Sequence, residues 1–414
     1  MHIEAKTFIE SVKKTYPDFF VNKRVIDIGA GDINGNNRYL FDNCEFIGVD
    51  VVSAPNVDLV SMAKDIPESI GLFDVVISSE CFEHDMQVYY SLRRIMKLLK
   101  PGGLFVFTCA SEGRPEHGTK RTSASDSYSL QLTTDLWYPN YYRNITMDDF
   151  VEILNPHHYF MSVSMTYNPI VGDFYFYGFR KNSEVLEDPV NSLSNVMNCY
   201  PTDKNSYFHN YPRQYNNLLK EYRLKNIRFL EIGVFQGHSI RAWRDYFRNA
   251  THIVGIDIDS RCAQYTQKDD AIYVHIGDIN SQKVVEEVNN LYGPFDIIID
   301  DGSHINVDVQ NTFELLFPKL NNNGLYIVED TITYKSSAHQ NTDKINQLQY
   351  FQNLTKYLNQ WRYDANIPNA IQDHCVDPFK IEKKTDNPLE YGIDSIHFGC
   401  SFIAVKKVLR KHWI

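Results

Sequence analysis

Two acidic pairs in the second half of the chain have the composition of a metal site. Asp300 and Asp301 end one apolar run, and Glu329 and Asp330 end the next. If these runs are neighbouring strands of an open α/β sheet, their carboxyl ends meet in one crevice. Carboxylates gathered there repel one another unless a cation lies among them. Oxygen ligands favour a hard ion such as Mg²⁺, so the pattern predicts a magnesium-type site.

His304 follows the first acidic pair within the segment 301–304, Asp-Gly-Ser-His. A hydroxyl is a poor nucleophile at neutral pH because it keeps its proton. A bound cation lowers its pKa, and a nearby base can remove the proton as the oxygen attacks a methyl group. We predict that His304 is this base. Asp-Gly is also a common turn signal, but the second acidic pair at 329–330 favours the functional interpretation.

A strand that ends in an acid and leads into a glycine-rich turn occurs in each half of the chain. These residues are Asp27, Gly29 and Gly31 in the first copy and Glu231, Gly233 and Gly237 in the second. Such turns bind many nucleotides. An acid just before the turn repels a pyrophosphate but suits the ammonium group of S-adenosylmethionine. Asp50 and Asp257, which end the next strand of each copy, would bind ribose hydroxyls in either case.

The alternative explanation is that the acids before the two turns only cap the helix that follows. The same order of acid, glycine turn and second acid occurs twice, which makes the capping explanation weaker. The acids also argue against an oxidoreductase with a dinucleotide cofactor, because its pyrophosphate would lie beside them.

The remaining apolar runs predict two copies of one α/β plan. The expected strands are 24–31, 46–50, 73–79 and 99–108 in the first half, and 228–237, 253–257, 295–301 and 320–329 in the second, with closing antiparallel strands at 174–179 and 395–405. Strands that alternate with helical patterns predict two Rossmann-like folds, each a doubly wound and mostly parallel sheet. We predict domains at 1–182 and 199–414, joined by a polar linker at 183–198.

The composition excludes several classes of protein. The 414 residues suffice for two cores, and a net charge of −11 argues against a nucleic-acid partner. No apolar run is long enough to span a membrane, and we see no signal peptide, so we expect a cytoplasmic protein. The seven cysteines are scattered without a Cys-x-x-Cys pair, which predicts a reducing compartment and no zinc site.

Both halves resemble class I S-adenosylmethionine-dependent methyltransferases over most of each domain. In that family the first-strand acid and the glycines hold the methionine part of the cofactor, and the second-strand acid holds the ribose. The resemblance implies S-adenosylmethionine in both domains, bound by the acids and glycines named above. It also implies that Asp278, which follows the run 273–277, lies near the adenine.

The second half further resembles metal-dependent O-methyltransferases that act on deoxysugars of macrolide and aromatic polyketide antibiotics. The matching stretches are 201–209 with Tyr211 and Tyr215, 231–237, 300–304 and 325–330. The resemblance implies Asp301, Glu329 and Asp330 as metal ligands and His304 as general base. It also implies a sugar or glycan acceptor and a homo-oligomer. One departure from the family pattern is the turn 321–324, where Pro-Gly-Gly is usual.

The first half resembles a metal-independent, type 11-like branch of the same superfamily. Ser78 and Ser79, then Thr108 and Cys109, stand where the second half has its acidic pairs. We therefore expect no metal site of that kind and metal-free catalysis. The candidates for chemistry are Glu80, Glu83, His84, Asp85, Glu112, Arg114, Glu116, His117, Tyr142 and Arg143. We interpret His84 as a residue that shapes the cofactor pocket.

His117 is the candidate base of the first half, because it lies in the charged loop 111–118, where functional residues concentrate. Together these patterns predict a bifunctional methyltransferase for sugar hydroxyls. The alternative is that only the second domain is catalytic and the first is a binding or assembly module. Methylation of nucleic acid or protein is disfavoured by the acidic charge and by the lack of an Asn/Asp-Pro-Pro-Tyr motif after either fourth strand.

Overall fold

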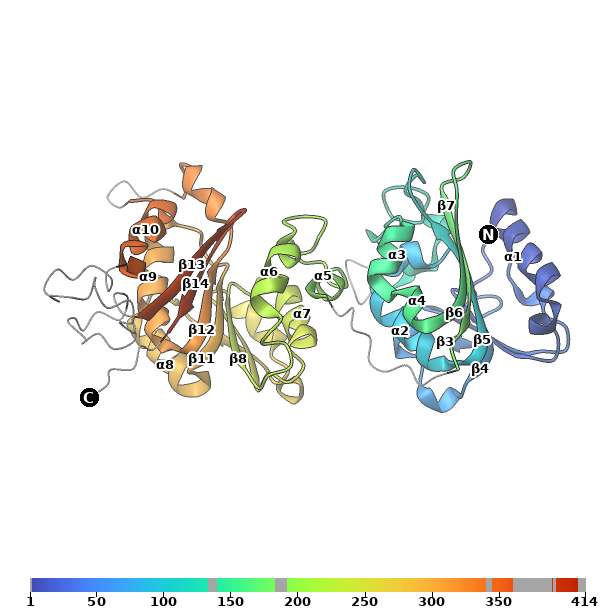
Figure 1. The fold of residues 1–414 in the computed structure, drawn as a ribbon, viewed down its shortest axis with the longest axis horizontal. Helices are drawn as coiled ribbons and strands as arrows, with labels where there is room; N and C mark the ends of the chain where they lie inside the picture. Colours follow the sequence, from blue (N-terminus) through green and yellow to red (C-terminus); the bar gives the residue numbers. More distant parts are fainter. Residues whose placement is uncertain are drawn as a thin grey trace, which may run out of the picture. The chain divides into compact units, whose positions relative to one another are not determined.

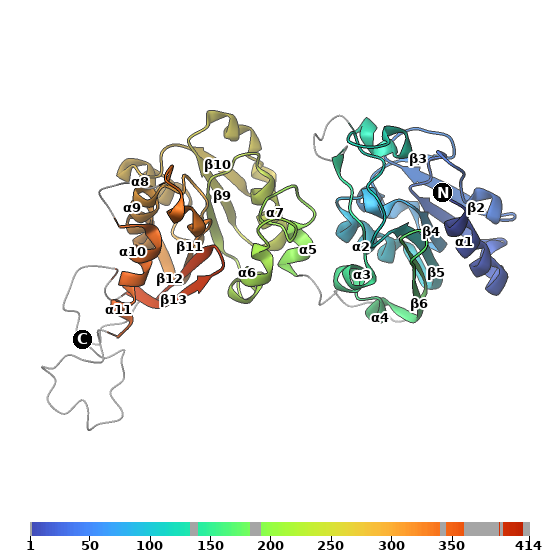
Figure 2. The same cartoon turned by 90° about the horizontal axis from the view of Figure 1, so that it is seen from above.

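The computed structural model describes residues 2–132, 140–182, 192–339, 345–359, 389 and 392–408. The chain divides into two compact units, Met1–Pro212 and Arg213–Ile414. Each unit contains one seven-stranded sheet (Figures 1 and 2). Residues 183–191 of the expected linker lie outside the described residues, and the following residues form the short helix α5 (Leu193–Met197).

The sheet of the first unit has the strand order β3-β2-β1-β4-β5-β7-β6. Its strands are β1 (Arg24–Ile28), β2 (Glu45–Asp50), β3 (Leu59–Val60), β4 (Phe73–Ser79), β5 (Leu99–Ala110), β6 (Phe160–Asn168) and β7 (Asp173–Arg180). Its longer helices are α1 (Ile3–Thr15), α2 (Val88–Leu98) and α3 (Met147–Leu154), and α4 (Pro156–Tyr159) is a single turn. The strands β1 to β5 run parallel, and β7 pairs antiparallel with β5 and β6.

Helices cover both faces of the first sheet (Figure 1). On one face, Ile9 and Val12 of α1 belong to a buried apolar cluster with strand residues such as Val25. On the other face, Phe150 of α3 packs its ring edge-on against Phe107 of β5, at a centroid distance of 5.1 Å. Burial on both faces explains why the central strands are continuous apolar runs.

The second sheet repeats the same order as β10-β9-β8-β11-β12-β14-β13. Its strands are β8 (Arg228–Ile232), β9 (His252–Asp257), β10 (Ile272–Ile276), β11 (Phe295–Asp300), β12 (Leu320–Val328), β13 (Ile393–Gly399) and β14 (Phe402–Lys407). The helices are α6 (Tyr211–Leu219), α7 (His238–Tyr246), α8 (Gln282–Tyr292), α9 (Asn306–Leu316), α10 (Gln347–Leu354) and α11 (Lys356–Asn359). Val288 of α8 and Phe313 of α9 are fully buried in the core cluster that also contains Ile298 of β11. The predicted pair of Rossmann-like folds is confirmed.

The closing strands differ from the sequence-based expectation. Each sheet ends in two antiparallel strands, because the run 395–405 is a hairpin of β13 and β14 that turns at Ser401, whose φ is +64°. The edge strand β6 was not expected, because most of its side chains are only partly buried and its sequence shows no apolar run. Of the helices that the structure describes, none is both long and apolar enough to cross a membrane.

The chain after the first glycine turn also differs between the units. In the second unit the turn leads into α7, which begins directly after Gly237. In the first unit the whole segment between β1 and β2 is described, and it contains only a single 3₁₀ turn at Arg38–Leu40. The first acid, Asp27, therefore has no α-helix behind it to cap.

Candidate active sites

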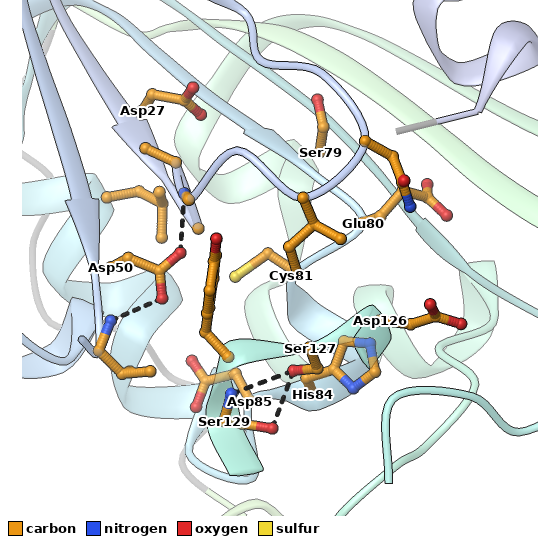
Figure 3. A pocket seen from close by; sticks show the side chains of 18 of the residues that line it. Asp27, Asp50, Ser79, Glu80, Cys81, His84, Asp85, Asp126, Ser127 and Ser129 are labelled. Atoms are coloured by element: carbon orange, nitrogen blue, oxygen red, sulfur yellow. Dashed lines mark hydrogen bonds between the residues drawn. The ribbon is translucent and has the colours of Figure 1, made fainter. Parts of the chain in front are cut away.

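A cavity of ≈ 520 Å³ opens at the carboxyl ends of β1, β2 and β4 in the first unit (Figure 3). The expected cofactor residues Asp27, Gly29, Gly31 and Asp50 all line it. His117, the expected base, lines the same cavity. The structure thus brings the four expected cofactor residues and the expected base together in one cavity, which Glu80, His84, Asp85, Arg114 and Glu116 also line, whereas Glu83, Glu112, Tyr142 and Arg143 are not among its lining residues.

Asp27 is 1 % exposed, and each of its carboxylate oxygens accepts a hydrogen bond of 3.2 Å from Nδ2 of Asn37. Burial raises the pKa of Asp27 to about 8, although the Asn37 hydrogen bonds oppose the shift. The amide of Asn37 is itself held by the hydroxyl of Ser79, at the end of β4. The charge of Arg38 also opposes the shift. A buried carboxyl that forms no ion pair among the described residues is suited to receive a cationic ligand group.

Asp50 holds the glycine turn from the neighbouring strand. Its Oδ2 accepts from the backbone N–H of Gly31 at 2.9 Å, and its Oδ1 accepts from that of Val51 at 2.7 Å (Figure 3). Burial raises its pKa. A Cβ at Gly31 would lie 2.4 Å from the ring of Tyr128 and 2.8 Å from Oδ2 of Asp50. Only glycine therefore allows these two side chains to meet over the turn.

Glu83, His84 and His117 form a compact group beside this cavity. Glu83 and His84 lie in the 3₁₀ turn Phe82–His84 after β4, and His117 lies in the loop after β5. The Nε2 of His117 lies 3.9 Å from Oε1 of Glu83, and the two imidazole rings are 5.0 Å apart. Tyr142 packs edge-on against both rings, at centroid distances of 5.5 and 4.9 Å.

Burial dominates the electrostatics of this group. Glu83 is fully buried, which raises its pKa well above the ordinary range, and the nearby charge of Glu80 adds to the shift. The pKa of His84 falls to about 4 because of burial and the neighbouring His117. Among the described residues, neither carboxylate oxygen of Glu83 and neither ring nitrogen of His84 has a hydrogen-bond partner.

A second polar group of the first unit is internally paired. The Nε2 of His2 lies 2.8 Å from Asp173 and 3.2 Å from Glu80. Arg114 donates to Oδ1 of Asp173 at 3.0 Å and lies 3.9 Å from Glu80. The hydrogen bonds to Asp173 and Glu80 raise the pKa of His2 to about 10. Two cations thus balance two carboxylates here.

The second unit builds its glycine turn in a related way. The Oδ2 of Asp257 accepts from the backbone amides of Val234 and Phe235 at 2.9 and 3.0 Å. Burial alone would raise the pKa of Asp257, but these amides and that of Asp259 lower it. Gly233 has a φ of +90°, and Gly237 has a φ of +72°. A Cβ at Gly237 would lie 2.6 Å from the ring of Tyr265, so this ring covers the second turn as Tyr128 covers the first.

Glu231 differs from its counterpart Asp27. It is fully buried, and its two oxygens accept hydrogen bonds from Ser239 at 2.8 Å and from Nε1 of Trp243 at 3.0 Å, both on α7. Its carboxylate is therefore engaged with the helix behind the turn. This is close to the alternative explanation from the sequence, in which the acid stabilises the following helix. The two acids occupy equivalent strand positions but have different partners.

Asp301, His304 and Asp330 come together at the carboxyl ends of β11 and β12. Their potential ligand atoms lie within 4.8 Å of one another, and all three residues are half-buried. The Nε2 of His304 lies 3.8 Å from Asp301 and 3.8 Å from Asp330. A Cβ at Gly233 would lie 2.2 Å from the backbone oxygen of Asp301, so the glycine turn packs against the backbone of Asp301.

Asp300, Glu329 and Asp278 are not members of this group. Asp300 is buried, accepts a hydrogen bond from Tyr326 at 2.9 Å, and has a pKa raised by burial to about 7. Glu329 is 1 % exposed and accepts from the hydroxyl of Tyr215 at 3.0 Å. Asp278 is exposed, and its Oδ1 accepts from the backbone N–H of Asn280. The expected roles of Glu329 and Asp278 stay predictions.

Strand registers align the two units residue by residue. Ile28 pairs with Ser78 in the first sheet, and Ile232 pairs with Asp300 in the second. Ser78 in turn pairs with Phe107, and Asp300 pairs with Val328. Thr108 and Cys109 therefore stand at the positions of Glu329 and Asp330, as the sequence alignment predicts. In the first unit the polar side chains of Glu83 and His84 lie further along the chain, in the 3₁₀ turn after β4.

Three residues of the first site were not predicted from the sequence. Asn37 bonds to Asp27, Ser79 bonds to Asn37, and Tyr128 covers Gly31. Asn37 lies in an irregular stretch without periodicity, and Tyr128 lies far from the turn in sequence. No local pattern could have identified either residue, although a polar Ser79 at the end of an apolar strand was a usable signal.

Comparison with known proteins assigns a domain type to each half. A family model described as a methyltransferase domain matches residues 2–154, and another with the same description matches residues 230–331. The chain is 36% identical over 148 residues to demethylmacrocin O-methyltransferase of Streptomyces fradiae, which is 34% of this chain and 36% of that protein. It is 27% identical over 209 residues to 8-demethyl-8-alpha-L-rhamnosyl tetracenomycin-C 2'-O-methyltransferase of Streptomyces olivaceus, which is 48% of this chain and 50% of that protein.

A solved structure of the methyltransferase MycE, from the mycinamycin biosynthetic pathway, in complex with Mg, SAH and mycinamycin VI is 26% identical, with a TM-score of 0.43. The similarity covers 53% of this chain and 55% of that one. The chain thus matches half or less of the length of the two curated relatives. The strand order, the glycine turns and the two family matches agree with one another. Each half of this chain is a methyltransferase domain with the class I, Rossmann-like fold.

Proposed function

We propose that the protein is a bifunctional S-adenosylmethionine-dependent O-methyltransferase for sugar hydroxyls. The observation that carries this proposal is the group of Asp301, His304 and Asp330, which lies in contact with the glycine turn at Gly233. Methyl transfer needs an activated acceptor oxygen beside the methyl donor. A group able to hold a cation and a proton acceptor, placed against a cofactor turn, meets that need.

S-adenosylmethionine would bind at the glycine turn of each unit. In the first unit, buried Asp27 would receive the ammonium group of the cofactor, and Asp50 would bind the ribose hydroxyls. In the second unit, Asp257 would bind the ribose, and the turn from Gly233 to Gly237 would lie against the methionine part. Because both oxygens of Glu231 bond to α7, we assign that residue the task of holding the turn in place.

The residues of the second unit fit a divalent cation. Asp301 and Asp330 would supply oxygen ligands, and buried Glu329 could join them by releasing Tyr215. Oxygen ligands suit Mg²⁺, which keeps some coordination positions for water or substrate. When bound, such a cation lowers the pKa of an acceptor hydroxyl. Asp301 and Asp330 would also orient the imidazole of His304, which lies 3.8 Å from each of them.

His304 would accept the proton of the acceptor hydroxyl. Its φ is +57°, and that of Asp330 is +50°, a conformation that costs energy for residues other than glycine. Such strain is retained where a side chain must be held in one place, and it tends to cluster at functional sites. The strained backbone on both sides of the group supports a catalytic role for it.

The curated relatives support a sugar hydroxyl as the acceptor. One of them methylates the 2'-oxygen of a rhamnosyl tetracenomycin, and another, from Streptomyces antibioticus, methylates the 3-oxygen of L-olivosyl-oleandolide, as their names state. The second relative is 36% identical over 172 residues. We propose a deoxysugar glycoside as acceptor. From the resemblance alone we also propose a homo-oligomer.

Bifunctionality is favoured over a passive first domain. A module that no longer binds cofactor would not need a cavity of ≈ 520 Å³ lined by Asp27, Gly31 and Asp50. Tyr128 also covers the turn in a way that only Gly31 permits. The first unit therefore has the features of a working cofactor site.

Calorimetric titration of the full chain with S-adenosylmethionine tests the proposal. We expect two equivalents per chain, one lost in Asp50→Asn and the other in Asp257→Asn, because these matched residues end equivalent strands. One equivalent, lost only in Asp257→Asn, would exclude a bifunctional enzyme.

Methyl transfer from labelled S-adenosylmethionine to rhamnosyl glycosides, with and without EDTA, then tests the acceptor and the metal. Activity of Asp50→Asn isolates the second domain, and we expect EDTA to abolish it. Unchanged activity of this variant in EDTA would contradict the assignment of the cation to the second unit.

A further inference from the structure

The first domain contains buried ionisable groups that nothing in its described structure satisfies. Both oxygens of Glu83 and both ring nitrogens of His84 are buried without a hydrogen-bond partner. The backbone amides of Glu83 and Ala110 lie near the carboxylate and lower its pKa, but neither makes a hydrogen bond to it. Buried polar groups are almost always paired, because leaving them unpaired costs stability. Several unpaired groups that face one another indicate a ligand between them.

We propose that Glu83, His84 and His117 form a binding site for a divalent transition-metal ion in the first domain. One ligand atom from each of these residues lies within 4.8 Å of the others. Two imidazoles and one carboxylate are a common ligand set for zinc and for iron(II), which leaves positions open for water or substrate. This site differs in residues and in position from the acidic group of the second domain.

The distances require only a small closure around an ion. Ligand atoms that share one ion at about 2.1 Å lie roughly 3.0 to 3.4 Å apart. The Nε2 of His117 lies 3.9 Å from Oε1 of Glu83. His117 is half-buried on a loop, whereas Glu83 is held in the core, so a shift of this loop by roughly half to one ångström brings this pair of atoms within range.

The backbone next to the site supports a fixed position for His84. Gly118 has a φ of +63°, and a Cβ there would lie 2.6 Å from Cε1 of His84. The loop that carries His117 can pass this close to the ring only because residue 118 is glycine. Tyr142 packs against both imidazoles from another side. The two histidines are therefore held facing each other by their surroundings.

We do not propose the neighbouring group of His2, Glu80 and Asp173 as a metal site. Its ligand atoms are equally close, but His2 hydrogen-bonds both carboxylates and Arg114 adds a second positive charge. A cation would have to displace these partners. Among the described residues, the one ion pair of the Glu83 group is that between Glu83 and His117.

The position of the site suggests what the ion does. His84 and His117 line the cavity that contains Asp27 and Asp50, so the ion would lie beside the cofactor. There it would bind the acceptor oxygen and lower the pKa of its hydroxyl. This role rests on the proposed function, whereas binding of the ion does not. The proposal replaces the expectation of metal-free catalysis and makes His117 a ligand in place of a base.

Cobalt(II) titration of the full, metal-stripped chain tests the site. The background variant Asp301→Asn/Asp330→Asn removes the acidic group of the second domain. In this background we expect one Co²⁺ per chain by calorimetry, with visible absorption bands that report nitrogen ligands. Added His117→Ala or Glu83→Gln should weaken the binding by about 100-fold or more. The control His157→Ala, which removes an exposed histidine of α4, should leave it unchanged.

The Co²⁺ titration decides whether the ion binds without reference to methyl transfer. No Co²⁺ binding in the background variant, or binding that survives both substitutions, would overturn the proposal. Circular dichroism and retained S-adenosylmethionine binding by the His117→Ala variant verify that it folds. If that variant loses methyl transfer by the first domain but keeps full Co²⁺ affinity, His117 is a base and the site is not a metal site.

Discussion

The Nε2 of His304 lies 3.8 Å from a carboxylate oxygen of Asp330, and both residues hold left-handed backbone conformations. They come from loops after different strands, β11 and β12, that are neighbours in the sheet. Two strained residues that meet from separate loops indicate a site whose geometry is set by the surrounding fold. In the first domain Glu83, His84 and His117 lie further along the loops that follow the equivalent strands, β4 and β5.

Replacement of His304 by asparagine tests the role of the side chain while the backbone conformation is kept. We expect His304→Asn to lower the rate of methyl transfer by the second domain by about 10²- to 10⁴-fold, because the base is lost. Asparagine tolerates a positive φ, so the loop should keep its shape. The measurement is turnover in the Asp50→Asn background, with cofactor affinity as control. A rate within threefold of the parent would show that another group takes the proton.

Replacement of a glycine in either cofactor turn should weaken cofactor binding in that domain only. We expect Gly31→Ala to weaken cofactor binding in the first domain only, because its Cβ would collide with Tyr128 and Asp50. Gly237→Ala should weaken binding in the second domain, through the Tyr265 ring and through about 1–2 kcal/mol of backbone strain. Calorimetry that counts cofactor equivalents in each variant checks both. Loss of both equivalents in one variant would mean that the sites are not independent.

Cofactor affinity of the first domain should depend on pH. Asp27 has a pKa of about 8 because it is buried, so the carboxyl is mostly protonated at pH 6. Binding of a cationic ammonium group requires the ionised form and releases the proton. We expect affinity to rise by up to about tenfold per pH unit between pH 6 and 8. Isothermal titrations at several pH values measure this rise, and Asp27→Asn should abolish the pH dependence.

The second domain offers an internal comparison for that experiment. The pKa of Asp257 is lowered by backbone amides, so this carboxylate is ionised throughout the same range. Its cofactor affinity should stay nearly constant from pH 6 to 8. A parallel rise in both domains would indicate titration of the cofactor and would contradict the assignment to Asp27.

His2 should stabilise the first domain below alkaline pH. Its pKa rises from 6.5 to about 10 through hydrogen bonds to Asp173 and Glu80. A raised pKa in the folded state stabilises the fold fully below pH 6.5, and the contribution is lost as the pH rises through 10. We expect His2→Gln to lower the free energy of unfolding at pH 6 by about 2 kcal/mol. Denaturation curves at pH 6 and 10 should show that this difference shrinks at pH 10.

Local sequence was sufficient to predict the repeated order of strands and turns. Apolar runs that end in Asp27 or Glu231 before a glycine turn are local signals, because strand formation and turn geometry depend on neighbouring residues. The approach of Asp301 to Asp330 also followed, since parallel strands end at the same edge of a sheet, whereas Asp300 and Glu329 bond to tyrosine hydroxyls. The edge strand β6 was not predictable, because its pairing with β7 gives it structure that its own composition does not specify.

The partners of each buried group were decided only by the tertiary structure. Asp27 borders a cavity while Glu231 bonds to Ser239 and Trp243, although the two acids occupy equivalent positions. His117 meets Glu83 only because the loops after β4 and β5 converge at the sheet edge. Burial and long-range contact set the charge state and the partner of a side chain. Neither quantity can be obtained from the residues next to it in sequence.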